Sequence, residues 1–427
     1  MSWFQKLIAI FKNKQLRNKI LFVLGIMVVF RLAAAIPIPG IDLENLKRFF
    51  NQNQFFGLMN VFVGGTLDNM SIVMLGLGPY ITGVIIIQLL TMVFPQLEKM
   101  FKEEGAAGRQ KVNQYGRLLT VPLAVLQAYS MIVLFQRQGA LGHFTSLQMV
   151  ITLITVAGGA VFLMWLGELI TEKGIGNGVS LLIFAGIVSN TPADIRQIIL
   201  SWDPANLPSY ILFLVASLAI IFGVVLITEA RRNILVSYAK RIRGNRIYGG
   251  SSTYLPINLN PAGVIPIIFA MSILLFPGMI ASFLAAGGTS WLTHGAKAVA
   301  DFLQNVWVHG ALYFILVFLF TFFYTAVTFD PKSIANNLQK MGGFVPGIRP
   351  GEKTAQFLHK ILYRILFLGA GSLGLIAVMP SIVQGITNVQ TFRFLVGGTS
   401  LLILVSVVLE TWRQIKAQVE MREYDNY

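Results

Sequence analysis

The sequence contains no cysteine and few ionisable groups that could serve catalysis. Without cysteine, the chain forms neither disulfides nor thiolate metal sites. Only 12% of its 427 residues are charged, and none of the 18 acidic residues lies deep within an apolar stretch. This argues against a proton relay or an intramembrane protease, both of which need buried carboxylates. The four histidines occupy loops or the ends of apolar stretches without metal-ligand spacing: His143, His294, His309 and His359.

Glycine is frequent, but the glycine runs lack the following Lys-Ser/Thr pair of a phosphate-binding loop. No nucleotide site, metal, cofactor or enzymatic activity is therefore predicted for this chain. Energy for any transport process would have to come from a partner.

Apolar sequence is what the chain has in abundance, with 55% hydrophobic residues. A membrane-spanning helix needs about 20 mostly apolar residues. We predict an all-α integral membrane protein with ten transmembrane helices. The predicted spans are Ile20–Ile38, Ser71–Phe94, Leu118–Phe135, Met149–Ile170, Val179–Asn190, Pro208–Ile227, Pro261–Ala285, Gly310–Phe329, Ile365–Val383 and Phe394–Leu409. Ala33-Ala34-Ala35 imitates a signal-peptide cleavage site, but the leader before it is long, so we interpret this run as the first membrane helix.

The basic residues of the loops predict the orientation. With both termini cytoplasmic, the cytoplasmic segments hold 26 of the 33 lysines and arginines, and the external segments hold 6. Basic residues near span ends are retained on the cytoplasmic side, so this bias favours ten crossings. Val179–Asn190 and Phe394–Leu409 are short enough to be re-entrant, but omitting either would reverse the charge bias of the segments after it.

The net charge of +15 consequently gathers on the cytoplasmic face. Anionic lipid headgroups explain scattered charges of this kind, and an acidic partner is the alternative. Two loops, Arg231–Tyr254 and Asp330–Lys360, are long and rich in glycine and proline. Loops of this length in a compact protein usually carry function or are disordered.

Ten spans divide into two halves, 1–205 and 206–427, with five spans each. An odd number of spans per half inverts the second half relative to the first, as in many transport proteins. Glycine and proline interrupt the second, fifth and seventh spans. Such irregular backbone is tolerated at membrane depth where protein or a water-filled cavity covers it, so together the breaks favour a cavity.

The segment Gln54–Met70 is apolar but too short to cross a membrane. It either lies at the interface as a short helix or folds back into an external funnel before the second span begins. Both interpretations are compatible with the residues alone.

The interior predicted from these spans is uncharged, apart from Arg31 near an external span end, where its side chain can reach the interface. An aliphatic constriction can gate by expelling water. Leu77 and Ile81 form an i, i+4 pair on one helix face, as do Val179 and Ile183. Such pairs are also what ordinary core packing would produce.

Seven strings carry a resemblance to a known family along nearly the whole chain. They are IPIPG at Ile36–Gly40, GPYITGVIIIQLL at Gly78–Leu90, FLMWLGELITEKGIGNG at Phe162–Gly178, YAKR at Tyr238–Arg241, NPAGVIPIIFA at Asn260–Ala270, FVPGIRPGEKT at Phe344–Thr354 and GGTSLLI at Gly397–Ile403. On these strings the chain resembles the SecY family of protein-conducting channels. The resemblance implies two inverted halves that close like a clamshell around an hourglass pore.

The resemblance also implies roles for individual residues. The pore ring would comprise Leu77, Ile81, Val179, Ile183, Ile268 and Ile403. The family often has isoleucine at ring positions, and Leu77 and Val179 depart from this while staying aliphatic. Segment 55–68 resembles the external plug, with Phe55, Phe56, Met59, Val61, Phe62, Gly64, Gly65 and Asp68. The lateral gate would contain Gln88, Gln127 and Ser272.

The two cytoplasmic loops, 229–260 and 330–364, resemble the family's docking platform for the motor ATPase SecA and for the ribosome. The residues implied in docking are Arg241, Arg243, Arg246 and Arg349. Small subunits resembling SecE and SecG are implied as well, with signal peptides and nascent polypeptides as substrates. The expected function is translocation of unfolded polypeptides across, and insertion of apolar segments into, the cytoplasmic membrane. Two alternative functions are a solute transporter and a membrane scaffold without a pathway. A transporter predicts ionisable groups at mid-membrane, and the absence of acidic residues there counts against it. A scaffold would not need apolar residues that converge from four spans.

Overall fold

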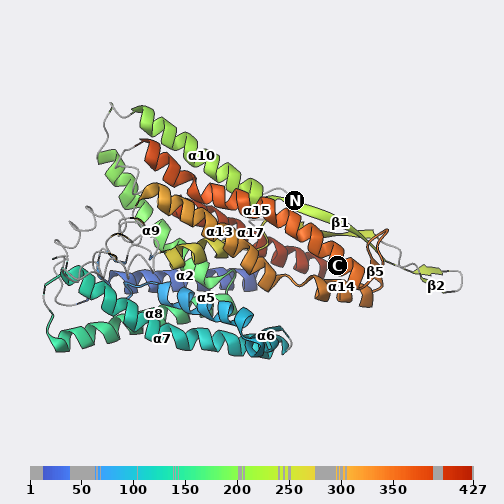
Figure 1. Ribbon diagram of the computed structural model, residues 1–427, viewed down its shortest axis with the longest axis horizontal. Helices are drawn as coiled ribbons and strands as arrows, with labels where there is room; N and C mark the ends of the chain where they lie inside the picture. The colour runs from blue at the N-terminus through green and yellow to red at the C-terminus, as the bar shows by residue number, and fades with distance from the viewer. Residues whose placement is uncertain are drawn as a thin grey trace.

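The computed structural model describes residues 13–38, 66–200, 207–274, 305–387 and 398–425, with short gaps inside these ranges, and a few single residues between them. Long helices run side by side along the longest axis of the molecule, and thin β-strands extend beyond them at one end (Figure 1). The helical body therefore has strands projecting from one of its two ends.

The first half contributes α2 (Lys14–Ala35), α5 (Gly78–Val93), α6 (Pro95–Lys102), α7 (Gly105–Arg137), α8 (Ser146–Lys173) and α9 (Gly178–Leu200). Side-chain caps fix where some of these helices start. The Asn13 side chain accepts the backbone N–H groups of Gln15 and Leu16 at the start of α2. Thr145 and Gln148 form a reciprocal capping box at the start of α8.

The second half contributes α10 (Leu207–Glu229), a short helix at Ile265–Leu274, α13 (Val306–Thr328), α14 (Pro331–Lys340), α15 (Glu352–Thr387) and α17 (Gly398–Asp425). Asp330 caps α14 by accepting the N–H of Lys332 at 3.0 Å, and Pro331 occupies the first helical position. Proline suits that position because its missing N–H would have no helical partner there.

Among the described residues, six helices are long and apolar enough to cross a membrane, namely those of α2, α7, α8, α10, α13 and α15. A seventh results if α5 and α6 are joined across their 109° bend. Gly178–Ser189 and Ile265–Leu274 are apolar but shorter. The chain is therefore a multi-pass membrane protein, while the count of ten spans stays a prediction. The second span is shorter than predicted because its helix begins at Gly78, not at Ser71.

The expectation of purely helical structure needs a correction, because the two loops that the sequence predicts to be cytoplasmic form strands. These are β1 (Arg231–Tyr238), β2 (Arg241–Arg243), β3 (Arg246–Tyr248), β4 (Ser252–Asn258) and β5 (Gly343–Phe344). One sheet has the order β4-β1-β5, and β2 pairs with β3 at the projecting tip. Alternation explains β1: Ile234 and Val236 are buried while their neighbours face solvent.

The main apolar core runs through both halves and includes residues of α2, α5, α7, α8, α9, α13, α15 and α17. A second cluster lies under the sheet, where Ile234 and Ile257 pack with Val345 of the second loop and with Leu358 and Leu362 of α15. The sheet is therefore attached to the helical body by its own hydrophobic contacts.

Candidate functional site

The residues of the predicted ring come from the ends of four helices. Leu77 is the N-cap of α5, and the N–H of Ile81 donates to the Leu77 carbonyl at 2.9 Å. Val179 and Ile183 occupy the first turns of α9. Ile268 lies in the short helix Ile265–Leu274, and Ile403 lies in the second turn of α17.

All six side chains belong to the main core or pack against it. Exposure is 6% for Leu77, 4% for Ile81 and Ile183, 3% for Ile268 and 1% for Ile403. Val179 is partly buried and packs against the same cluster. Every buried polar residue of the described part is uncharged, being serine, threonine, glutamine or asparagine. The structure thus places the six residues in an uncharged apolar interior.

A tightly packed non-helical segment precedes the ring. Thr66, Leu67, Met70, Ser71, Val73 and Met74 are fully buried. The N–H of Ile38 donates to the carbonyl of Met70 at 2.9 Å, and the N–H of Ile72 donates to that of Ile36 at 3.0 Å. Positive φ angles at Met70 and Gly76 turn this segment into α5. Sequence reasoning missed these anchors, although Gly76, Gly78 and Pro79 signalled the break.

Residue Gly159 of α8 allows the close approach of this segment. A Cβ atom at Gly159 would collide with the carbonyl oxygen of Ile72. The adjacent Gly158 faces open space. Only one glycine of the pair is therefore required by packing.

The plug residues Phe55, Phe56, Met59, Val61, Phe62, Gly64, Gly65 and Asp68 lie outside the described residues. Their described neighbours Val63, Thr66 and Leu67 are buried, and Val63 and Leu67 belong to the same core as the ring. The Thr66 hydroxyl donates to the carbonyl of Val63 at 3.3 Å or to that of Met74 at 3.4 Å.

The three predicted gate residues occupy α5, α7 and the short helix Ile265–Leu274. Gln127 is buried, and its Oε1 would lie 3.9 Å from a Cβ atom placed on Gly78 of α5. Oε1 of Gln88 is buried without a hydrogen-bond partner. The Ser272 hydroxyl donates to the Ile268 carbonyl of its own helix at 2.9 Å. The structure therefore places Gln127 against α5, whereas the hydroxyl of Ser272 is satisfied within its own helix.

Two ion pairs connect helices at the ends that the sequence predicts to be cytoplasmic. Arg117 of α7 lies 2.5 Å from Glu168 of α8. Arg413 of α17 lies 3.0 Å from Glu229 at the end of α10. The sequence alone did not identify these two pairs, because their partners lie on different helices and are distant in sequence.

Glu410 lies one residue beyond the predicted tenth span and close to the entry of the short helix. Its Oε2 would be 3.5 Å from a Cβ atom on Gly263, and the Asn260 side chain donates to the Gly263 carbonyl at 2.9 Å. Burial raises the pKa of the Glu410 carboxyl, and the positive charge of Arg413 partly opposes this shift.

The predicted docking residues lie on two loops that the sheet joins. Arg241 and Arg243 are on β2, and Arg246 is on β3, with Arg243 opposite Arg246 in register. Arg349 is exposed, and its carbonyl accepts the Thr354 hydroxyl at 3.0 Å. Ser237 of β1 pairs with Phe344 of β5, so the two loops form one platform. Within the part of the chain that the structure describes, no group of three or more potential ligands could hold a metal.

Comparisons with known proteins agree with this picture. The sequence model of the SecY family matches residues 71–412. The protein translocase subunit SecY of Streptomyces coelicolor is 44% identical over 438 residues, covering 98% of each chain. The subunit of the same name from Mycobacterium tuberculosis is 40% identical over 443 residues, again covering 98% of each.

Solved structures share the fold. A structure described as a protein conducting channel has a TM-score of 0.67 at 21% identity, covering 93% of this chain and 91% of the other. Sec61 in the canine ribosome-channel complex has a TM-score of 0.63 at 20% identity, with the same coverage.

Proposed function

The chain belongs to the SecY family, and we propose that it forms a channel through which unfolded polypeptides cross a membrane. The same pathway would release apolar segments sideways into the lipid. It is a channel subunit and not an enzyme, as its relatives' name, protein translocase subunit, implies. One observation carries this proposal: six aliphatic residues from four helix ends lie in one uncharged interior.

The architecture proposed is ten crossings in two inverted halves, 1–205 and 206–427. Each predicted span coincides at least in part with a described helix, including the short Gly178–Ser189 and Ile265–Leu274. The orientation proposed places both termini and the strands in the cytoplasm, with the channel in the cytoplasmic membrane. The bias of basic residues supports this orientation.

The six ring residues are proposed to seal the resting channel. A constriction without charge or hydrogen-bonding groups expels water and thereby blocks ions. A passing polypeptide can displace such side chains, because no specific bonds between them must break. The plug, 55–68, is proposed to support the seal from the external side, since the described residues next to it are buried in the same core.

The lateral gate is proposed to involve Gln88, Gln127 and Ser272. Hydrogen bonds between membrane helices contribute only about 0.6–2 kcal/mol each. Hydrogen bonds this weak can be displaced by an incoming apolar signal helix. The buried, unpartnered Oε1 of Gln88 supports this role, because a polar atom in that state gains a partner on rearrangement.

The cytoplasmic platform is proposed to bind SecA or the ribosome through Arg241, Arg243, Arg246 and Arg349. Guanidinium groups suit carboxylates and the phosphates of ribosomal RNA. Subunits similar to SecE and SecG, signal peptides and nascent chains, and anionic lipids complete the proposed partners. The pairing of β1 with β5 supports a single platform.

Site-specific crosslinking tests the proposed pathway. A polypeptide stalled halfway through transport is exposed to photoreactive groups at Ile81, Ile183 and Ile268 in the channel complex. We expect adducts at all three positions. A probe at Leu218 of α10, whose side chain is 58% exposed, serves as the lipid-facing control and should give none. Adducts at Leu218 only, or at no position, would contradict a pathway through the ring.

A further inference from the structure

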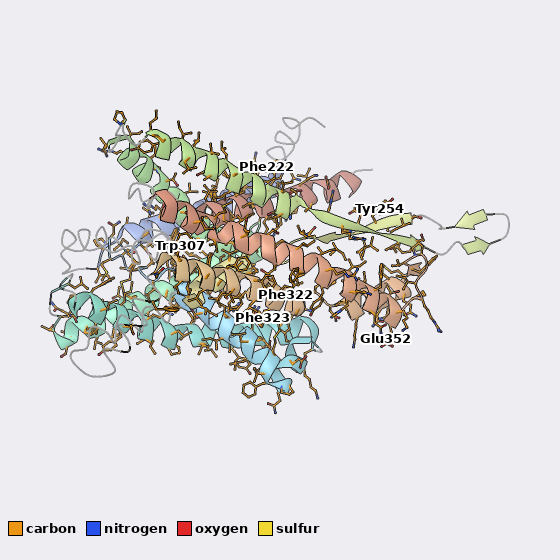
Figure 2. The ribbon with its side chains drawn as sticks, turned by 45° about the horizontal axis from the view of Figure 1, so that its top comes forward. Phe222, Tyr254, Trp307, Phe322, Phe323 and Glu352 are labelled. Atoms are coloured by element: carbon orange, nitrogen blue, oxygen red, sulfur yellow. The ribbon has the colours of Figure 1, made fainter. Side chains whose placement is uncertain are left out.

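A pocket of about 730 Å³ lies where the two halves meet near the strand-bearing end, and we call it the seam pocket. One wall is α15, and the opposite wall is formed by α6 and α7, with the junction of α13 and α14 between them. From α15 it is lined by Glu352, Ala355, Gln356, His359, Leu362, Tyr363 and Leu366. Figure 2 shows Glu352 toward the strand-bearing end and Trp307, at the start of α13, toward the other.

The polarity of the seam pocket changes along its length. Glu352, Gln356 and His359 line the part nearest the start of α15, and Leu362 and Leu366 line the far part. His359 and Tyr363 stack with ring centroids 4.3 Å apart at the transition. Aromatic residues with a polar edge favour the boundary between lipid headgroups and hydrocarbon.

The predicted membrane boundary crosses the two helices α13 and α15 that line the seam pocket, at the level where its lining changes from polar to apolar. On α15 the predicted span begins at Ile365, between Tyr363 and Leu366. On α13 the span ends at Phe329, so Thr325 lies inside it and Lys332 outside. The deep part of the pocket is thus at hydrocarbon level, and the outer part is at headgroup level.

Charges of both signs surround the outer part. Arg109 and Lys332 are the cations, and Asp330 and Glu352 are the anions. The Arg109 guanidinium lies 5.6 Å from the centroid of the Phe101 ring, which holds it at the wall formed by α6 and α7. A purely anionic ligand would leave the two carboxylates facing its charge. A zwitterionic headgroup, with a phosphate and an ammonium group, complements both pairs.

The volume separates a lipid from a helical peptide. From Glu352 to Leu366 the lined face of α15 is about 21 Å long, and a helix of that length and 10 Å diameter fills roughly 1,600 Å³. The seam pocket offers less than half of this volume. It does fall within the range of about 300–1,000 Å³ that is usual for pockets that bind small molecules.

From these observations we propose that the seam pocket binds one zwitterionic aminophospholipid, with its headgroup between Arg109, Lys332 and Glu352 and an acyl chain along Leu362 and Leu366. The lipid lies across the seam between the halves. A smaller crevice lined by Thr91, Met92, Glu98, Phe101, Ala326 and Val327 continues along the same seam.

Photolabelling with lipids tests this proposal in the complete channel complex. Phosphatidylethanolamine with a photoreactive acyl chain is compared with phosphatidylglycerol carrying the same chain, and labelled peptides are mapped. We expect phosphatidylethanolamine adducts concentrated at 355–366 and at Phe101, with about tenfold less labelling by phosphatidylglycerol. Free phosphoethanolamine should not compete, because it lacks the chain. Equal labelling by both lipids, or effective competition by free phosphoethanolamine, would overturn the proposal.

A matched pair of variants on α13 controls for folding. Ala326 lines the pocket and is exposed, whereas Ala311 is exposed on the same helix outside it. Ala326→Trp should reduce the labelling several-fold by filling the pocket, and Ala311→Trp should leave it unchanged. Glu352→Gln should narrow the difference between the two lipids, because it removes a carboxylate that favours the ammonium group of phosphatidylethanolamine. Equal labelling in both tryptophan variants would show annular lipid only, and labelling of 355–366 by a photoreactive signal peptide would show a helical occupant instead.

Discussion

Arg413 of α17 binds Glu229 at the end of α10, with both Nε and Nη2 lying 3.0 Å from Oε1 of the carboxylate. The same guanidinium donates to the carbonyl of Thr228. Strand β1 begins two residues after Glu229, and the proposed ring residue Ile403 lies ten residues before Arg413 on α17. This contact therefore connects the start of strand β1 with the helix that carries the proposed ring residue Ile403.

Arg413→Ala should weaken the response of the channel to a docked partner more than it weakens folding. The two side chains are 35% and 57% exposed, so the pair contributes at most about 1 kcal/mol to stability. We expect unchanged partner binding and a several-fold lower rate of partner-driven transport in reconstituted vesicles. Lys416→Ala, which removes an exposed pair with Glu420 on the same helix, is the control. Equal rates in the two variants would exclude the coupling.

Polar replacement in the ring should make the resting channel leak ions. Ile81→Ser and Ile268→Ser each place a hydroxyl in a nearly fully buried apolar position, which lowers the cost of hydrating the constriction. Conductance of the resting channel in planar bilayers should rise several-fold. Leu218→Ser on the exposed face of α10 is the control. Ring variants with the conductance of this control would remove Ile81 and Ile268 from the seal.

Arg349→Glu should impair export with little effect on folding. The side chain is exposed, and the turn is held by backbone contacts such as the Thr354 hydroxyl bond to the Arg349 carbonyl, which the substitution preserves. Motor-driven transport should fall at least about tenfold, as expected for reversal of a charge-assisted contact. Lys353→Glu, at an exposed position on the first turn of α15, gives a comparison of equal charge change. Normal export by Arg349→Glu would remove this residue from the docking surface.

Adjacent glycines on α8 should respond differently to alanine. Gly159→Ala forces a methyl group into the carbonyl of Ile72 and should cost about 1–3 kcal/mol or more, because the main chain itself must move. Gly158→Ala adds a methyl group in open space and should leave stability unchanged or raise it. Thermal unfolding of the two variants in detergent measures the difference. Equal melting temperatures would contradict the close packing of 70–73 on α8.

Glu410→Gln should stabilise the protein at neutral pH. Burial raises the pKa of this carboxyl, so the folded state holds the proton more tightly than the unfolded state. The destabilising contribution of the charged form therefore grows as pH rises above the ordinary carboxyl pKa and reaches its full size above the raised pKa. The melting temperature of Glu410→Gln should exceed that of the parent at pH 7 to 8, and the difference should vanish toward pH 4. Glu420 is exposed, so the difference in melting temperature between Glu420→Gln and the parent should not change in this way between pH 8 and pH 4.

The apolar runs predicted the helical elements well because membrane helices satisfy their backbone groups internally, so local sequence decides them. Strands β1 and β4 were missed because their pairing depends on tertiary contacts: β1 pairs with β4 on one edge and with β5 on the other, and β5 lies about a hundred residues further along the chain. The start of α5 at Gly78 depends on contacts of 70–72 with 36–38 and with α8, which hydropathy does not register. The partners of Glu168 and Glu229 could not be predicted from local sequence either, because Arg117 and Arg413 lie on other helices.

Strand β1 has neighbours on both of its edges, and this has a practical consequence for protein engineering. A chimera that receives residues 229–260 from a relative would have to re-form the contact of Ser237 and Tyr238 with the native Phe344 and Gly343. The donor residues at positions 234 and 257 would also have to pack against Val345 of the recipient chain. Transplants of the two strand-bearing loops, 229–260 and 330–364, should therefore succeed when both come from the same donor and fail when they are mixed.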